Sequence, residues 1–263
     1  MVMRISTNRQ QETGGRQSGG SSPGLELWLK DGDQALVQIV SSGDPADNPS
    51  EVDSRIDDFY IHTIQSTSDS GGRAFKQFLC EPLTYETDDD CEHCADNKNP
   101  GHQFGMWCYV YYILHNEQRQ DDWEEVQNRG GVTRYKQTVN NFMVFAKGFG
   151  RGDYLWNQVS DIYNEQEGLN NFQTRIKRNG SGLRDTSYVI ASTNAKAEWP
   201  DDLLDRGGQL PTIKDFFSRK YGAVKADAEE LLDVSAVSVK DEKTPAVSKE
   251  TDIADLLDDE DLF

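Results

Sequence analysis

Three of the four cysteines in this chain lie within fifteen residues, at Cys80, Cys91 and Cys94, and they constrain the fold more than any other feature. Cysteines spaced in this way form a disulfide, a redox couple or a metal clamp. The first 24 residues have no apolar core typical of a signal peptide, so we expect an intracellular protein with reduced thiols. The surroundings lack the βαβ pattern of a redox couple. A metal site is therefore favoured over unrelated cysteines.

A structural zinc ion takes four nitrogen or sulfur ligands in a closed tetrahedron. The three clustered cysteines supply three of them, and the candidates for the fourth are His62, His102 and Cys108. His62 is favoured because it lies on the predicted strand just before the one that ends at Cys80. Cys108 falls within an apolar strand, where a cysteine is typically a small core residue. The sequence thus predicts one structural Zn²⁺ ion with the ligands His62, Cys80, Cys91 and Cys94.

Short strand-like segments make up most of the remaining pattern. We expect two strands over 25–40 around a Lys-Asp-Gly-Asp turn, a hairpin over 172–193, and further strands over 57–64, 74–80, 105–115 and 138–149. Apolar residues at helical spacing predict helices over 153–168 and 212–221, and a polar insertion spans 81–103. The pattern predicts a mainly β protein with a few helices, arranged as a small β-barrel with insertions.

Charge is distributed unevenly along the chain. The formal net charge is −19, yet residues 129–184 hold nine Lys and Arg against four Asp and Glu. Residues 225–263 hold thirteen Asp and Glu against four Lys. We expect a flexible basic arm over 1–23, a core over 24–224 with a zinc subdomain at about 57–105, and a disordered acidic tail over 225–263. No membrane contact is expected, because no apolar run approaches the roughly 20 residues that span a bilayer.

The aromatic strand GMWCYVYYILH predicts two different faces. Alternation places Trp107, Tyr109 and Tyr111 on one face, and places Tyr112 on the other, in the core. The first face either packs under a helix or loop, or forms a stacking surface for unpaired bases. Basic residues on nearby predicted strands and turns favour the second interpretation. The predicted DNA-binding residues are Arg73, Lys76, Trp107, Tyr109, Tyr111, Lys136, Lys147, Arg151, Arg175, Lys177, Arg178 and Arg184.

Taken together, these features resemble the zinc-containing single-stranded-DNA-binding proteins of tailed bacteriophages, of the T-even-phage helix-destabilising type. The segment WLKDGDQALVQIV is similar to the opening strand pair of that family. The order His62, Cys80, Cys91, Cys94 matches its His-Cys-Cys-Cys zinc ligands, and IKRNGSGLRDTSYVI is similar to its basic hairpin. The resemblance covers roughly residues 25–220, and extends to the acidic tail by character only.

The resemblance implies an OB-fold, a five-stranded Greek-key barrel, with a zinc-stapled insertion. It implies a protein that coats single-stranded DNA during phage DNA replication, recombination and repair, in the cytoplasm of the infected bacterial host. Self-association on the DNA is a further implication. The family has a basic cluster before Ser-Thr near its N-terminus, whereas MRIST supplies only Arg4 before Ser6 and Thr7.

The end of the chain, DIADLLDDEDLF, joins a run of acidic residues to a terminal Leu and Phe. Such a segment either keeps the protein soluble or enters a basic pocket with an apolar floor on a partner. The resemblance implies recruitment of phage replication and recombination proteins, namely a polymerase, a helicase or primase, and a recombinase. The predicted partner-binding residues are Asp258, Asp259, Glu260, Asp261, Leu262 and Phe263.

Two other classes of function are alternatives: a zinc-dependent nucleic-acid enzyme, and a zinc-ribbon-like adaptor that binds proteins only. A zinc deaminase needs a His-x-Glu step ahead of its Cys-x-x-Cys. His62 is followed by Thr-Ile, so that step is missing there. A nuclease needs paired carboxylates on adjacent strands, and no convincing pair is found. We therefore expect a binding protein without catalytic residues.

Overall fold

The computed structural model describes residues 25–40, 55–67, 73–95, 99–128, 130–148, 154–169, 171–182, 185–196 and 210–221. The expected core falls largely on these residues. The expected arm at 1–23 and the acidic tail at 225–263 lie outside them. Within the described ranges, no helix is both long enough and apolar enough to cross a membrane.

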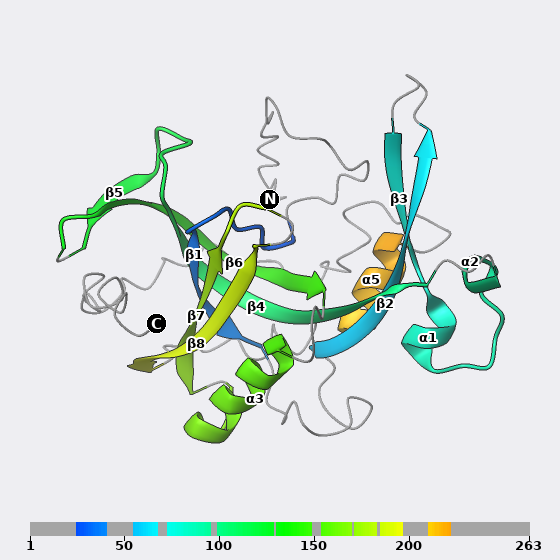
Figure 1. Ribbon diagram of the computed structural model, residues 1–263. Coiled ribbons are helices and arrows are strands. Elements are labelled where there is room, and N and C mark those ends of the chain that lie inside the picture. The colour runs from blue at the N-terminus through cyan, green and yellow to red at the C-terminus, as the bar shows by residue number, and fades with distance from the viewer. Residues whose placement is uncertain are drawn as a thin grey trace, which may run out of the picture.

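The described part of the chain is mainly β, as predicted, with eight strands in one antiparallel sheet (Figure 1). Six strands follow the order β3-β2-β4-β1-β7-β8, while β6 pairs with both β4 and β5. The strands are β1 (Gln34–Ile39), β2 (Ile56–Thr67), β3 (Arg73–Leu79), β4 (Gly101–His115), β5 (Glu124–Gln127), β6 (Thr133–Gly148), β7 (Phe172–Asn179) and β8 (Ser187–Lys196). The helices are α1 (Glu81–Tyr85), α2 (Glu92–Ala95), α3 (Tyr154–Gln166) and α5 (Ile213–Tyr221).

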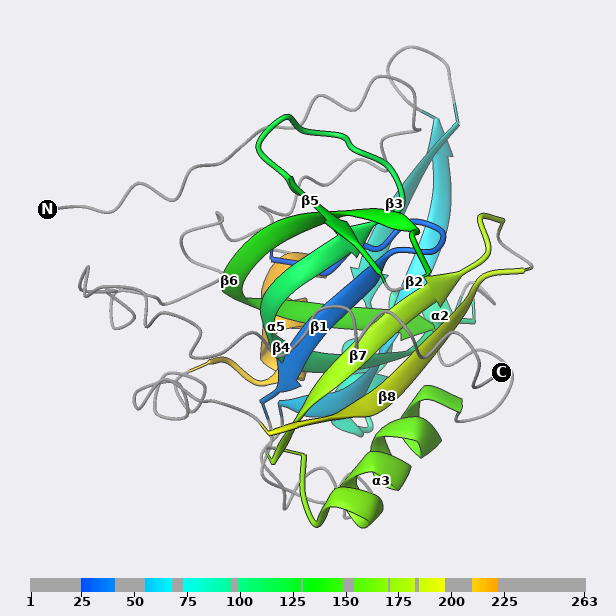
Figure 2. The same cartoon turned by 90° about the vertical axis from the view of Figure 1, so that its left-hand side faces the viewer.

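Strand β4 is the centre of the sheet because both of its edges are paired. β6 follows one edge of β4 from Gln103 to His115. On the other edge, β2 pairs with the first part of β4 and β1 pairs with the second part. Aromatic and β-branched residues favour this extended conformation, which confirms the strand predicted over 105–115. Figure 2 shows β1, β7 and β8 side by side, with β4 and β6 arching away from β1.

The first of two apolar cores lies between the curved sheet and helix α3. Met106 and Cys108 of β4 point into this core and are fully buried. Helix α3 covers it with Leu155, Val159 and Ile162, which recur at helical spacing and are all buried. The helix predicted over 153–168 is thereby confirmed, and a fourth apolar residue of its pattern, Tyr163, packs partly buried against the same core.

The second core lies on the opposite face of β4, under helix α5. Trp107 of β4 packs there with Ile213, Phe216 and Phe217, which are all buried. Gly105 allows this approach, because a Cβ atom at that position would lie only 2.8 Å from Cγ2 of Ile213. The short helix predicted over 212–221, with both phenylalanines inward, is confirmed.

Segment 25–30 lies between β6 and β7 and does not form the first of the two strands expected over 25–40. It makes a single parallel bridge to β6, at Glu26 and Val144, where the amide of Leu27 donates to the carbonyl oxygen of Val144 at 2.9 Å. On its other side, Nη1 of Arg178 in β7 donates to the carbonyl oxygen of Leu29 at 2.6 Å. The segment is thus held from two strands that are not neighbours in the sheet.

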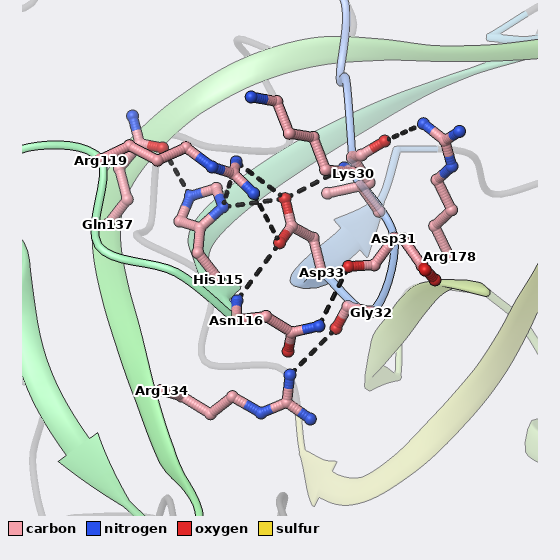
Figure 3. Close-up of polar contacts among 11 residues, drawn as sticks. Lys30, Asp31, Gly32, Asp33, His115, Asn116, Arg119, Arg134, Gln137 and Arg178 are labelled. Atoms are coloured by element: carbon pink, nitrogen blue, oxygen red, sulfur yellow. Dashed lines mark hydrogen bonds and ion pairs between the residues drawn. The ribbon is translucent and has the colours of Figure 1, made fainter. Parts of the chain in front are cut away.

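The Lys-Asp-Gly-Asp turn predicted at 30–33 is present and joins this segment to β1 (Figure 3). Gly32 has a φ of 74°, in the left-handed region that glycine adopts most easily. Within the turn, the amide of Lys30 donates to the buried Asp33 carboxylate at 3.0 Å. Asp31 reaches outside it, since Oδ1 accepts a hydrogen bond from the amide of Gly180 at 2.6 Å. The turn therefore connects β1 to the β7–β8 hairpin.

Three short elements, β5, α1 and α2, were missed by the sequence patterns. β5 pairs with β6 beyond the end of β4, although its sequence has no strand-like alternation. The insertion expected over 81–103 contains the short helices α1 and α2, which follow the β2–β3 ribbon. The strands expected at 57–64 and 74–80 form that ribbon, and the hairpin expected over 172–193 is formed by β7 and β8.

Candidate metal centre and nucleic-acid interface

One imidazole and three thiols come together at the base of the β2–β3 ribbon. His62 lies in β2, and Cys80 follows β3 directly, where its amide donates to the carbonyl oxygen of Tyr60 at 2.8 Å. The antiparallel pairing of the two strands therefore places His62 close to Cys80. Cys91 precedes α2 and Cys94 lies within it, so the single helical turn directs both thiols to one side.

The distances within this group fit a single metal ion. Its four ligand atoms all lie within 4.8 Å of one another. Nε2 of His62 is 3.3 Å from Sγ of Cys91 and 3.6 Å from Sγ of Cys94. Sγ of Cys94 is 3.7 Å from Sγ of Cys80. A tetrahedral zinc ion, with bonds of about 2.3 Å to sulfur and about 2.0 Å to nitrogen, separates its ligand atoms by about 3.5–3.8 Å. The predicted four residues are confirmed as a compact group that can hold one metal ion.

The other candidate ligands lie elsewhere. Cys108 is fully buried in the first core, where burial raises the pKa of its thiol. His102 contacts the carboxylate of Asp58 through Nε2, and its ring stacks on Tyr60 with 4.4 Å between ring centroids. His93 lies outside the four-residue group, and its ring is 4.8 Å from that of Phe78. The choice of His62 over Cys108 and His102 therefore agrees with the geometry.

The three thiols of the metal group differ in their ease of ionisation. Burial raises the pKa of Cys80 to about 12. Burial also acts on Cys91, but hydrogen bonds from the backbone amides of Cys94 and His93 outweigh it and lower the Cys91 pKa. A metal ion binds thiolates, so it must displace protons from these groups, Cys80 in particular. Metal binding by this group should consequently depend on pH.

The four side chains come from two parts of the chain, the β2–β3 ribbon and the segment around α2. Four protein side chains are the number of ligands that a tetrahedral metal ion takes. A metal held in this way joins the β2–β3 ribbon to the segment around α2. Such a link would stabilise the insertion.

The predicted stacking surface of Trp107 and Tyr109 is not accessible. Trp107 has 0% of its surface exposed, and its Nε1 donates to the carbonyl oxygen of Pro211 at 2.9 Å. The Phe216 ring of α5 lies edge-on to it, at 5.3 Å between ring centroids. Tyr109 is also buried in the second core. The prediction that these two rings receive bases is wrong, because α5 and the second core already cover that face of β4.

A β-bulge in β4 brings a different tyrosine to the surface. The pairing register shifts between Val110 and Tyr112, so the alternation of side chains reverses there. Tyr112, expected in the core, therefore faces outward and is partly exposed. Nζ of Lys136 lies 5.1 Å from its ring centroid, and Arg175 is close enough to act on its ionisation. Burial raises the Tyr112 pKa to about 12, and the charge of Arg175 acts in the opposite direction.

The pairing of β1 with its neighbours explains how these groups meet. Leu36 of β1 pairs with Tyr112 on one side and with Arg175 of β7 on the other. Lys177 lies two residues beyond Arg175 and therefore on the same face of β7. We call Tyr112, Lys136, Arg175 and Lys177 the outer-face cluster. Lys136 also pairs with Glu124 of β5, with 3.5 Å between Nζ and Oε2.

The remaining predicted DNA-binding residues do not join this cluster in the described structure. Lys76 is exposed on β3, in the ribbon beside the metal group. The Tyr111 ring is partly buried and lies edge-on to Tyr109 at 5.2 Å between centroids. Arg151, Arg184 and the side chain of Arg73 lie outside the described residues, as does the predicted partner-binding segment 258–263.

Arg178, one of the predicted DNA-binding residues, is hydrogen-bonded within the protein. Besides the bond to Leu29, its Nε donates to the carbonyl oxygen of Gly180 at 3.2 Å, and its Nη2 donates to Oγ1 of Thr186 at 3.4 Å. All three guanidinium nitrogens thus have a protein acceptor. Arg178 therefore joins β7 to segment 25–30.

Lys147 lies near the end of β6 in a group of aromatic rings that the sequence did not indicate. Its Nζ is 4.3 Å from the ring centroid of Trp28, 5.1 Å from that of Tyr188 and 5.8 Å from that of Phe145. Burial lowers the Lys147 pKa to about 8, although the Glu26 carboxylate acts in the opposite direction. The sequence analysis did not name Trp28 as a candidate binding residue. The one sequence signal that it faces outward is its alternation with Leu27 and Leu29, which are buried.

Comparison of the sequence with models of protein families and with curated proteins gave no significant match.

Proposed function

We propose that this protein is a non-enzymatic single-stranded-DNA-binding protein. The observation that carries the proposal is the partly exposed Tyr112 ring, with Lys136 5.1 Å from its centroid and Arg175 on the adjoining part of the same face of the sheet. An aromatic ring can stack on a base of any sequence, and flanking cations pair with the phosphates on either side. Duplex DNA keeps its bases stacked inside, so such a cluster favours unpaired strands.

The proposed fold is an OB-fold made of β1, β4, β6, β7 and β8. The pairings of β1 with β4 and β7, of β4 with β6, and of β7 with β8 are those expected for such a barrel. Helix α3 lies between β6 and β7 in the chain, and the β2–β3 ribbon is an insertion between β1 and β4. Contact between Phe145 of β6 and Tyr188 of β8, at 5.4 Å between ring centroids, supports closure of the barrel.

The proposed metal is one zinc ion held by His62, Cys80, Cys91 and Cys94. Thiolate and imidazole ligands suit zinc, and a closed site suits a structural role. The zinc would fix the ribbon and the insertion against the rest of the sheet. No step of DNA binding requires the metal to contact DNA.

The proposed biological setting follows from the same resemblance to phage single-strand-binding proteins. The protein would coat DNA during phage replication, recombination and repair in the cytoplasm of the host. Its acidic segment 258–263 would recruit a polymerase, a helicase or primase, and a recombinase. The whole acidic tail over 225–263 would also compete with DNA for cationic groups, because its net charge has the sign of a phosphate chain.

Titration of the full chain with fluorescently labelled oligo(dT) tests the binding function. Tight binding to the single strand, weak binding to the matching duplex and a strong decrease with salt are expected. Tyr112→Ala should weaken binding by about 1–3 kcal/mol, whereas Tyr112→Phe retains the ring and most of the affinity. Arg175→Ala should reduce the salt slope by about 0.7. Equal affinity for single strand and duplex, or no binding by the unmodified protein, would contradict the proposal.

A further inference from the structure

Trp28 is the most exposed large apolar side chain of the described residues, with 68% of its surface exposed. Its backbone is nevertheless fixed. Leu27 and Leu29, on either side of it, are buried in the first core, and the amide of Leu27 donates to the carbonyl oxygen of Val144 at 2.9 Å. An exposed indole on a fixed backbone loses little conformational freedom when it binds a ligand. It is therefore suited to contact a binding partner.

The indole ring itself is also oriented. Nζ of Lys147 lies 4.3 Å from the ring centroid, which places a cation against one face. The indole Nε1 donates to Oε2 of Glu26 at 3.3 Å. The other carboxylate oxygen of Glu26 pairs with Lys220 of α5, and both of those side chains are largely buried. With Lys147 on one face and Glu26 at the edge, the opposite face of the ring is the part open to solvent.

We infer that the free face of Trp28 stacks on one unpaired base, while Lys147 beneath the ring strengthens the electrostatic attraction for the strand. The inference rests on the proposed function and adds a contact outside the outer-face cluster. The surroundings favour a base over an apolar side chain of a protein partner. The polar contacts around the ring come from charged groups, Lys147 and Glu26, and Lys147 lies in addition between Trp28 and Tyr188.

Substitution of Trp28 in the full chain tests this contact with oligo(dT) as the probe. Trp28→Ala should weaken binding about 5- to 150-fold with little change in salt slope, because stacking neutralises no phosphate. The matched control is Tyr154→Ala, which removes a ring of similar exposure (55%) from α3 and should change the affinity less than twofold. Affinity of Trp28→Ala within twofold of the unmodified protein would overturn the inference.

A fluorescence measurement keeps the test decisive if Trp28→Ala folds poorly. Of the four tryptophans in the described ranges, Trp107 and Trp123 are buried and Trp156 is partly buried. With Trp199 replaced by Phe in every sample, Trp28 should therefore account for most of the quenching on DNA binding. Trp28→Phe retains a ring and should bind DNA while losing more than half of this quenching; unchanged quenching overturns the inference. If Tyr112→Ala loses DNA binding and Trp28→Ala does not, the proposed Trp28–base contact is ruled out and the proposed DNA-binding function stands. If the unmodified protein does not bind oligo(dT), both the Trp28–base contact and the proposed DNA-binding function are ruled out.

Discussion

The carboxylate of Asp33 lies 2.9 Å from Nδ1 of His115, and both side chains are buried where the 30–33 turn meets the end of β4 (Figure 3). Arg119 reaches both carboxylate oxygens, at 3.1 and 3.3 Å. Nε2 of His115 is 3.0 Å from Oε1 of Gln137 on β6, and the imidazole stacks on Trp123 at 4.0 Å between centroids. One carboxylate therefore joins the turn, the end of β4 and the loop that leads to β5.

Stability should depend on this carboxylate and on pH. Burial would raise the pKa of Asp33, but hydrogen bonds from His115 and Lys30 outweigh it and hold the pKa below 3.8. The stabilisation is thus present above the unfolded value of 3.8 and is lost as the pH falls through the lower folded value. Asp33→Asn should reduce the free energy of unfolding at pH 7 by on the order of 3 kcal/mol, measured in urea, because Arg119 and His115 lose a buried anion.

The control for this experiment is Asp161→Asn, which changes an exposed carboxylate on α3 and should alter stability by less than about 0.5 kcal/mol. If Asp33→Asn unfolds at the same urea concentration as the unmodified protein, the buried carboxylate has no stabilising role.

We expect bound metal to depend on the group formed by His62, Cys80, Cys91 and Cys94. Mass spectrometry should find one metal ion per chain, and Cys91→Ser should remove it and reduce stability by on the order of 5 kcal/mol, because metal binding and folding of the insertion are coupled. Cys108→Ala is the matched control, since this thiol lies in the first core, and it should retain the metal. Retention of metal by both Cys91→Ser and His62→Ala would show that these residues are not ligands.

DNA affinity should weaken at alkaline pH through Lys147. Burial lowers the pKa of this lysine to about 8, with Arg178 and Lys220 acting in the same direction and Glu26 in the opposite one. Raising the pH from 7 to 9 should therefore remove one cation and reduce the salt slope for oligo(dT) by about 0.7. Lys147→Arg keeps its charge at both pH values and should show a constant slope. A slope in the unmodified protein that does not change with pH would exclude Lys147 as a phosphate contact.

Trp107 should matter for stability and not for DNA contact. Trp107→Phe keeps a ring in the second core but removes the hydrogen bond to the carbonyl oxygen of Pro211. We expect a loss of about 1–3 kcal/mol in the free energy of unfolding, because the part-buried carbonyl oxygen of Pro211 is left without its donor. Affinity for oligo(dT), measured well below the melting temperature, should stay within about twofold. A large loss of affinity with unchanged stability would return Trp107 to the binding surface.

The metal group is the part of the candidate site that the sequence predicts best. Cys91 and Cys94 are close in the chain, and the two strands that carry His62 and precede Cys80 are consecutive. Few other side chain types can bind a soft metal. Residue type and short spacing together therefore leave only a small number of possible ligand sets. The mainly β class and the helices with Leu155 and Phe216 inward also follow from local periodicity.

The nucleic-acid surface depends on contacts that local periodicity does not contain. Strict alternation places Tyr112 in the core and Trp107 outside, whereas the bulge after Val110 reverses the alternation and α5 covers Trp107. Arg178 has the charge of a phosphate ligand, but its guanidinium bonds to Leu29, 149 residues away in the chain. A bulge, a covering helix and a distant carbonyl acceptor decide which rings and charges remain available. Each depends on groups far apart in sequence, so only packing in three dimensions establishes it.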